Sequence, residues 1–220
     1  DFEKYPRPLE KDLELAKSRG ADVVFHPSVE EIYPEHFQTL IEVTELSKPL
    51  CGLYRLGHFR GVATVVLKLF NIVQPDVALF GEKDYQQLQI IRRMAKDLHL
   101  DVEIIGVPTV RVSGGLAMSS RNQYLSSEEL KSAIALSKAL NKAQELVDEG
   151  MIDAIQIIEI LREMIEQERE CKVQYISICH PETLERMTRV REKALIAMSV
   201  FCGETRLIDN RIIKPNEKTI

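Results

Sequence analysis

The chain has 220 residues and a formal net charge of −5, and 45% of its residues are hydrophobic and 29% are charged. This length fits one large domain or two small ones, the interspersed charges lack the basic stripe of a nucleic-acid-binding protein, and no apolar run reaches the roughly 20 residues of a membrane span. The four cysteines show no C-x-x-C pairing, so we expect reduced thiols in a cytoplasmic protein.

The first half of the chain predicts strands that alternate with helices. In chain order, the patterns predict a helix at residues 9–18, a short buried strand at 22–25, a candidate strand at 38–46, a buried helix at 61–75, a strand at 77–80, a helix at 85–98 and a strand at 101–107. The run "VALF" at 77–80 shows no alternation of apolar and polar residues, so we expect a strand covered on both faces. Alternating strands and helices indicate an α/β domain with a parallel sheet.

The pattern changes after residue 108. A capping box, "SSEE" at residues 126–129, opens a long helix that Gly150 ends, and Asp153 caps a second helix. Three strands are predicted at 173–178, 194–201 and 205–210, the last two as a hairpin. Two helices with a small antiparallel sheet make an α+β lobe, so we expect one domain at residues 1–108 and a second at residues 109–220.

A turn of Gly81, Glu82, Lys83 and Asp84 joins the strand at 77–80 to the next helix. In an open parallel sheet, ligands bind beyond the carboxyl ends of the strands, and a glycine there lets the backbone approach a ligand closely. The helix offers unpaired N–H groups and Lys83 a positive charge, so the turn suits a phosphate, while Asp84 could hold a sugar hydroxyl. A plain polar turn with Asp84 as the N-cap explains the same residues equally well.

A second segment, "GGLAMSSRNQYLS" at residues 114–126, combines a glycine-rich turn with Met118, Ser119, Ser120 and Arg121. Arginine binds phosphate oxygens through its fork of N–H donors, and glycine-hinged loops commonly close over a reacting phosphate. The segment by itself slightly favours the alternative, a domain linker with an exposed basic residue.

A third segment, "GHFRG" at residues 57–61, places His58 and Arg60 between glycines before a helix. It could be a loop on the substrate side or a plain turn at a helix entry. We expect the plain turn for His58 and leave the role of Arg60 open.

Taken in this order, these segments resemble the pantoate–β-alanine ligase (pantothenate synthetase) family. The resemblance runs nearly end to end, and two of its segments, "FGEKDYQQL" and "GLAMSSRNQYL", are together highly specific. The matching segments are "YPR" at 5–7, "PSVEEIYP" at 27–34, "GHFRGVATVVLKLFNIVQPD" at 57–76, "FGEKDYQQL" at 80–88, "GVPTVR" at 106–111, "GLAMSSRNQYL" at 115–125 and "TRLIDN" at 205–210.

The resemblance implies an enzyme that activates (R)-pantoate with ATP to pantoyl adenylate and pyrophosphate, after which β-alanine displaces AMP to give pantothenate. It also implies a Rossmann-like nucleotidyltransferase domain with a smaller C-terminal lid domain, a homodimer, and Mg²⁺ as a cofactor. For the residues, it implies catalytic roles for Lys83 and Arg121, pantoate binding by Gln87, and nucleotide contacts by Gly81, Glu82, Lys83, Asp84, Val110, Met118, Ser119, Ser120 and Arg121.

The sequence also departs from the family pattern. Members of the family begin with a strand that leads to a P-T-M-G-x-L-H-x-G-H segment, whose histidines bind ATP phosphates, and a later N-P-x-Q-F segment grips pantoate. Neither segment occurs in these 220 residues. We therefore expect that the chain lacks the opening βαβ unit of the fold, on the order of 30 residues or more, and that it is inactive by itself.

Two other functions compete with the ligase. A related adenylyltransferase would transfer AMP to a phosphate ester and stop there, which the glutamine at position 87 argues against. A non-catalytic binding or scaffold module would retain the fold without the chemistry. The retained residues argue against it; they are Lys83, Asp84, Gln87 and Arg121.

Overall fold

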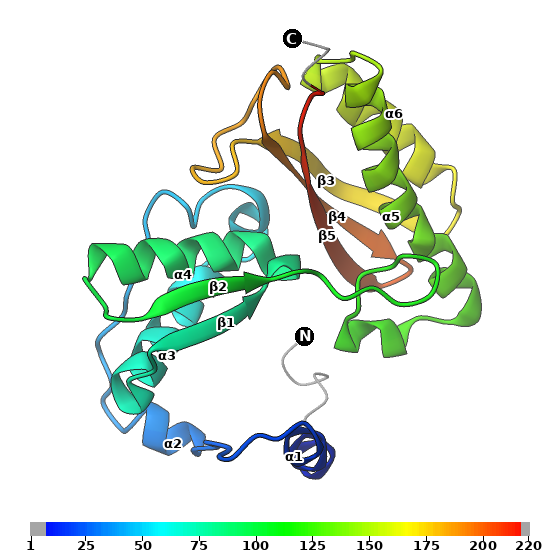
Figure 1. Ribbon diagram of the computed structural model, residues 1–220. Helices are drawn as coiled ribbons and strands as arrows, with labels where there is room; N and C mark the ends of the chain where they lie inside the picture. The colour runs from blue at the N-terminus through cyan, green and yellow to red at the C-terminus, as the bar shows by residue number, and fades with distance from the viewer. Residues whose placement is uncertain (1–7, 217–220) are drawn as a thin grey trace. The chain divides into compact units, whose positions relative to one another are not determined.

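Figure 1 shows the computed structural model of the chain, which describes residues 8–216. These residues form two compact units that divide after Thr39. The first unit contains α1 (Leu9–Ser18), as predicted, and α2 (Val29–Ile32), whose capping box is built by Ser28 and Glu31. The "YPR" segment of the family resemblance lies outside the described residues.

The strand predicted at residues 22–25 is wrong. The segment has no regular structure, and Val23 is 82% exposed while Phe25 is 50% exposed. A strand exists only where a neighbouring strand takes its backbone hydrogen bonds, and none of the described strands pairs with this segment. Its apolar composition alone therefore did not determine its conformation.

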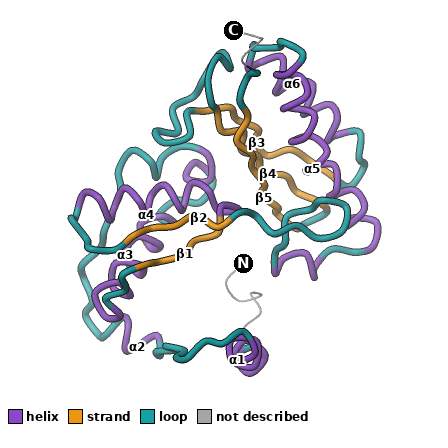
Figure 2. The backbone as a smooth tube through the Cα atoms, in the orientation of Figure 1, coloured by secondary structure: helices purple, strands orange, loops and turns teal. Residues whose placement is uncertain are grey.

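The second unit, from Leu40 onward, contains the predicted parallel sheet. In chain order it has the 3₁₀-helix η1 (Leu50–Leu53), α3 (His58–Val73), β1 (Val77–Gly81), α4 (Tyr85–Asp97) and β2 (Glu103–Val107). The two strands pair in parallel, with Val77 opposite Glu103 and Gly81 opposite Val107. Figure 2 shows α3 and α4 running alongside this two-stranded sheet. The α/β prediction is confirmed for this part of the chain.

Two details of the prediction differ from the structure. The candidate strand at 38–46 is irregular, and its Ile41 N–H donates to the Thr64 hydroxyl at 3.0 Å instead of to a strand. The strand β1 is covered on one face only, because Val77 is 47% and Leu79 is 65% exposed while Phe80 packs into the core. The apolar run correctly predicted a strand but not its burial.

The remainder of the second unit is the predicted α+β lobe. It consists of α5 (Ser127–Asp148), α6 (Ala154–Glu166) and an antiparallel sheet of β3 (Cys171–Cys179), β4 (Ala194–Cys202) and β5 (Thr205–Ile213), in the order β3-β4-β5. Both helices cover one face of the sheet (Figures 1 and 2). The helix starts follow the predicted caps: Ser126 and Glu129 form a capping box, and Asp153 accepts from two N–H groups of α6, each cap contributing about 1 kcal/mol.

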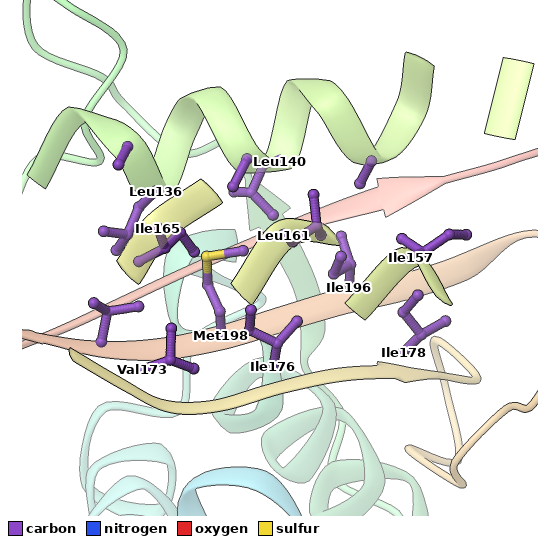
Figure 3. Close-up of a cluster of buried hydrophobic side chains, with 14 of the residues drawn as sticks. Leu136, Leu140, Ile157, Leu161, Ile165, Val173, Ile176, Ile178, Ile196 and Met198 are labelled. Atoms are coloured by element: carbon purple, nitrogen blue, oxygen red, sulfur yellow. The ribbon is translucent and has the colours of Figure 1, made fainter. Parts of the chain in front are cut away.

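The core of this lobe lies between the helices and the sheet. Leu136 and Leu140 of α5, together with Ile157 and Leu161 of α6, pack on the sheet face that carries Ile196 (Figure 3). The central strand β4 is buried along nearly its whole length, because Leu195 and Ala197 on its other face pack against residues of α3 and α4. β4 is thus the strand that is covered on both faces, and it joins the two sheets into one unit.

The predicted fold class, a parallel α/β sheet with a smaller α+β part, is confirmed. The domain boundary near residue 108 stays a prediction. Within residues 8–216, no helix is long and apolar enough to span a membrane.

Candidate active site

A small cavity lies where the end of the parallel sheet meets the antiparallel sheet. Its volume is about 60 Å³, which is room for a few water molecules. Its lining comes from the start of α3, the turn after β1, the segment 116–122 and β5. A larger open groove of about 1440 Å³ runs between residues 41–54, α4 and residues 180–193, but none of the predicted site residues lines it.

The turn after β1 is a short 3₁₀-helix, η2 (Glu82–Asp84), that leads directly into α4. It is tied to β5 because the side-chain amide of Asn210 donates to the carbonyls of Glu82 at 3.0 Å and Lys83 at 2.8 Å. Both hydrogen bonds go to backbone carbonyls, and the Lys83 side chain lines the cavity. β5 therefore fixes the backbone of the turn without using its charged groups.

Asp84 does not cap the helix. It occupies the N-cap position of α4, yet its side chain makes no capping hydrogen bond, and it is exposed in the cavity lining. Gly81 has an ordinary φ of −67°, and a Cβ atom there would meet no atom of the protein within 4 Å. Neither residue is fixed by a capping bond or by a steric requirement, so both are available to a ligand.

The glycine-rich segment is a tight hairpin followed by the 3₁₀-helix η3 (Ser120–Tyr124). The N–H of Met118 donates to the carbonyl of Val110 at 2.8 Å, and the N–H of Val112 to that of Leu116 at 2.9 Å. At its tip, Gly114 and Gly115 have φ values of +86° and +87°. The added Cβ of an alanine at Gly114 would lie 2.8 Å from Ile134 of α5. These glycines are required by conformation and by close packing on α5.

A buried ion pair anchors this hairpin to the sheet. Arg111 donates to both carboxylate oxygens of Asp209, at 2.7 and 3.0 Å, and also to the carbonyl of Gly115 at 2.8 Å. The Asp209 side chain is completely buried. Two-point binding of a buried carboxylate fixes orientation as well as position, so Arg111 places the following segment beside β5.

The structure brings together five of the predicted site residues. Lys83, Asp84, Gln87, Ser119 and Arg121 all line the cavity. The Ser119 hydroxyl accepts from the Arg121 N–H at 3.2 Å, which fixes the start of η3. The β1 turn and the arginine segment, about 38 residues apart in sequence, thus converge on one cavity.

The other predicted residues lie around this cavity without lining it. Gly81 ends β1, and the Glu82 carboxylate points toward Gly106 on β2. Val110 and Met118 are 59% and 56% exposed and pair with each other across the hairpin. Ser120 is the first residue of η3.

Sequence reasoning missed part of the lining. Arg55, Arg206 and Tyr175 line the cavity, as does His58, for which we expected a plain turn. The Tyr175 hydroxyl contacts the Cys51 thiol at 3.3 Å, and burial raises the pKa of this tyrosine well above its usual range. Arg206 had a signal because it stands inside the "TRLIDN" segment, and His58 had one because it stands inside "GHFRG".

Positive charge dominates the electrostatics of this site. Burial, followed by the nearby Arg121 and Arg206, lowers the pKa of Arg55. Burial and the adjacent Arg55 lower the pKa of His58 to about 4, so His58 is neutral at pH 7. A cavity with these groups and Lys83 suits anionic ligands such as phosphates and carboxylates.

Comparisons with known proteins point to one family. The family described as "Pantoate-beta-alanine ligase" matches residues 1–212. A pantothenate synthetase of Thermoanaerobacter sp. (strain X514) is 53% identical over 210 residues, which are 96% of this chain and 74% of the relative. The crystal structure of pantothenate synthetase from Thermus thermophilus matches with a TM-score of 0.93 at 44% identity, over 98% of this chain and 78% of that chain.

A third relative was solved with ligands. The pantoate-beta-alanine ligase from Francisella tularensis, complexed with "Beta-gamma ATP and Beta-alanine", matches with a TM-score of 0.78 at 34% identity, over 96% of this chain and 72% of that chain. The relatives in these solved structures share the fold described above. The chain spans about three quarters of the length of these relatives.

Proposed function

The chain belongs to the pantoate–β-alanine ligase family, and from this membership we propose that it condenses (R)-pantoate with β-alanine through a pantoyl-adenylate intermediate. It is an ATP-dependent ligase that forms an amide bond in pantothenate biosynthesis. The observation that carries the proposed mechanism is the convergence of the Lys83 turn and the Arg121 segment on one cavity.

The chemistry proceeds in two steps. A carboxylate is a poor electrophile, so the pantoate carboxylate first attacks the α-phosphorus of ATP, an O–P bond forms, and the bond to pyrophosphate breaks. The neutral amine of β-alanine then attacks the acyl carbon, a C–N bond forms, and AMP leaves with the electron pair of the broken C–O bond. The proton that the amine loses passes to solvent. The protein has little covalent work to do, so it acts by positioning and by stabilising charge.

Lys83 and Arg121 supply that charge in this proposal. Both line the cavity from different elements, and both suit the negative charge that develops on the phosphates. Gln87 follows Asp84 by three residues and lies on the first turn of α4, from which it can bind pantoate in the same cavity.

The remaining contacts are assigned by position. Gly81 and Asp84 would meet the ribose and phosphates from the β1 turn, together with Glu82 beside them. Val110 would meet the adenine through its backbone. Met118, Ser119 and Ser120 would form with Arg121 a loop that closes over the phosphates, as glycine-hinged loops commonly do.

Mg²⁺ would accompany ATP. Among residues 8–216, no group of three or more His, Cys, Asp or Glu side chains could hold a metal ion, but Mg²⁺ at nucleotide sites is held mainly by substrate phosphates with one or two carboxylates. The exposed carboxylate of Asp84 in the cavity lining fits that role. The ion would neutralise part of the triphosphate charge.

The family resemblance also supports a cytoplasmic homodimer with a domain boundary near residue 108. Size-exclusion chromatography with light scattering tests the dimer, and limited proteolysis around residue 108 tests the boundary.

Two activities measured on the natural reading frame that contains this chain test the function. We expect pantoate-dependent exchange of labelled pyrophosphate into ATP without β-alanine, and AMP release at steady state only when β-alanine is added. AMP transfer to a phosphate ester would favour the adenylyltransferase instead. Nucleotide binding without either activity would favour the scaffold module. The expectation that the 220-residue chain alone is inactive stays a prediction, and AMP release by that chain would contradict it.

A further inference from the structure

Two arginines in the cavity lining have no role in the proposed phosphate contacts. Arg55 precedes α3 and Arg206 lies on β5, and both are half-buried in the lining. Within residues 8–216, neither guanidinium forms an ion pair with a carboxylate. The carboxylate of Asp84 lies in the same cavity lining and acts on Arg55 without contacting it. Two half-buried guanidinium groups that touch no carboxylate can be stabilised by water or by an anionic ligand.

The hydrogen-bond partners of these arginines carry no negative charge. An Arg55 Nη donates to Nε2 of His58 at 2.9 Å, and this imidazole is neutral at pH 7. Arg206 donates from Nε to the Gln174 amide oxygen at 2.9 Å and from Nη to the Cys51 thiol at 3.5 Å. Each guanidinium has five N–H donors, so both keep donors for a ligand.

The neighbouring backbone adds to the positive potential. No side chain caps the first turn of α3, and this turn contains no acidic residue. His58 and Phe59 of the same turn line the cavity. A helix N-terminus attracts negative charge, so it acts in the same direction as the two arginines.

The proposed reaction brings three kinds of anionic group to this cavity. The phosphates have Lys83 and Arg121, and the pantoate carboxylate is converted into the adenylate. The carboxylate of β-alanine persists through the reaction and has no partner in the roles assigned so far. The planar fork of a guanidinium matches the two oxygens of a carboxylate.

We propose that Arg55 and Arg206 bind the carboxylate of β-alanine and thereby select an amino acid as the attacking amine. This inference rests on the proposed function. His58 is a positioning residue, because its neutral imidazole accepts from Arg55 and orients that guanidinium. The same positive cluster disfavours an ammonium ion, so it also increases the fraction of β-alanine in the neutral, nucleophilic form.

The test measures adenylation and amide formation separately, in the protein encoded by the natural reading frame that contains this chain. Arg55→Lys and Arg206→Gln should change pantoate-dependent pyrophosphate exchange by less than about 3-fold. They should raise the KM for β-alanine by about 10- to 100-fold, the loss expected for charge-assisted hydrogen bonds. The preference for β-alanine over 3-aminopropan-1-ol, which has the same chain without the carboxylate, should fall by a similar factor.

Two arginines outside the cavity provide matched controls. The control variants are Arg60→Gln and Arg211→Gln. Arg60 lies in the same turn of α3 as His58, and Arg211 lies on the same strand as Arg206. Both arginines are exposed, and neither lines the cavity, so neither variant should change the KM for β-alanine. If Arg206→Gln does not fold, Arg206→Lys should show the same direction of change, because lysine keeps the charge but loses the fork.

Each outcome is decisive. An unchanged KM for β-alanine, or an unchanged preference over 3-aminopropan-1-ol, would overturn the inference. A fall in pyrophosphate exchange equal to the loss of the β-alanine reaction would assign the two arginines to ATP or pantoate instead. Absence of pantoate-dependent exchange in the unsubstituted protein would reject the proposed function, and the inference with it.

Discussion

Replacing Arg111 with methionine tests how strongly one buried ion pair holds the hairpin of the candidate site. The Asp209 side chain is 0% exposed and accepts two hydrogen bonds from Arg111, whose side chain is 33% exposed. Removing one partner of a buried pair costs about 3–5 kcal/mol, because the other charge stays buried and unpaired. Water reaches the partly exposed position of Arg111, so we expect the lower end, about 3 kcal/mol.

This loss is large enough to measure by calorimetry. For a chain of this size, each kcal/mol lowers Tm by about 2–4 °C, so Arg111→Met should lower Tm by about 6–12 °C. The double variant Arg111→Met/Asp209→Asn should recover more than half of the loss, because it contains no unpaired buried charge. Arg211→Met serves as the control, since the partner of Arg211 is the amide of Asn141 at an exposed site.

Either of two results would refute this reasoning. Arg111→Met could lower Tm no more than Arg211→Met does. Alternatively, the double variant could be as unstable as Arg111→Met alone. In both cases the bidentate contact would contribute little to stability, and the hairpin would be held mainly by its own backbone bonds and by its packing on α5.

Other residues allow further tests. Lys83→Ala should lower the rate of pyrophosphate release by roughly 10²–10³-fold, as for the loss of one charge-stabilising donor. Gly114→Ala should destabilise the protein by about 1–3 kcal/mol in urea unfolding, because φ is +86° and the new methyl group would press on Ile134. Gly81→Ala should leave stability unchanged or slightly higher but weaken ATP binding, because its Cβ meets no protein atom. The pKa of His58 is lowered to about 4 in the folded protein, so as pH falls the unfolded chain binds a proton at His58 before the folded protein does. The free energy of unfolding should therefore decrease by about 1–2 kcal/mol between about pH 6.5 and pH 4. His58→Gln should remove this part of the pH dependence.

The results that would contradict these predictions are distinct. An unchanged rate for Lys83→Ala would remove this lysine as a phosphate ligand. Equal stability losses for Gly114→Ala and Gly81→Ala would mean that the two glycines serve the same structural purpose. An identical acid dependence for His58→Gln and the unsubstituted protein would show that another group titrates in this range.

Local signals predicted the helices well. The capping box at Ser126 and the cap at Asp153 start α5 and α6, because a cap needs only the residues within one turn of the chain. The same locality holds for the turn that follows β1, because its residues predicted a turn between a strand and a helix. Phosphate binding by this turn stays a prediction. The family resemblance depended on these segments too.

Pairing and burial depended on tertiary structure, because each strand needs a partner that the local sequence does not name. The apolar residues 22–25 form no strand, whereas β4 is covered on both faces because two layers pack against it. Tertiary packing also brought Arg206 of β5 beside Arg55, and paired Arg111 with Asp209 across 98 positions of the chain. The sequence by itself determines which charged and polar groups are present. Only the tertiary structure decides which of them meet in the cavity, because contacts between distant segments form when the two sheets pack together.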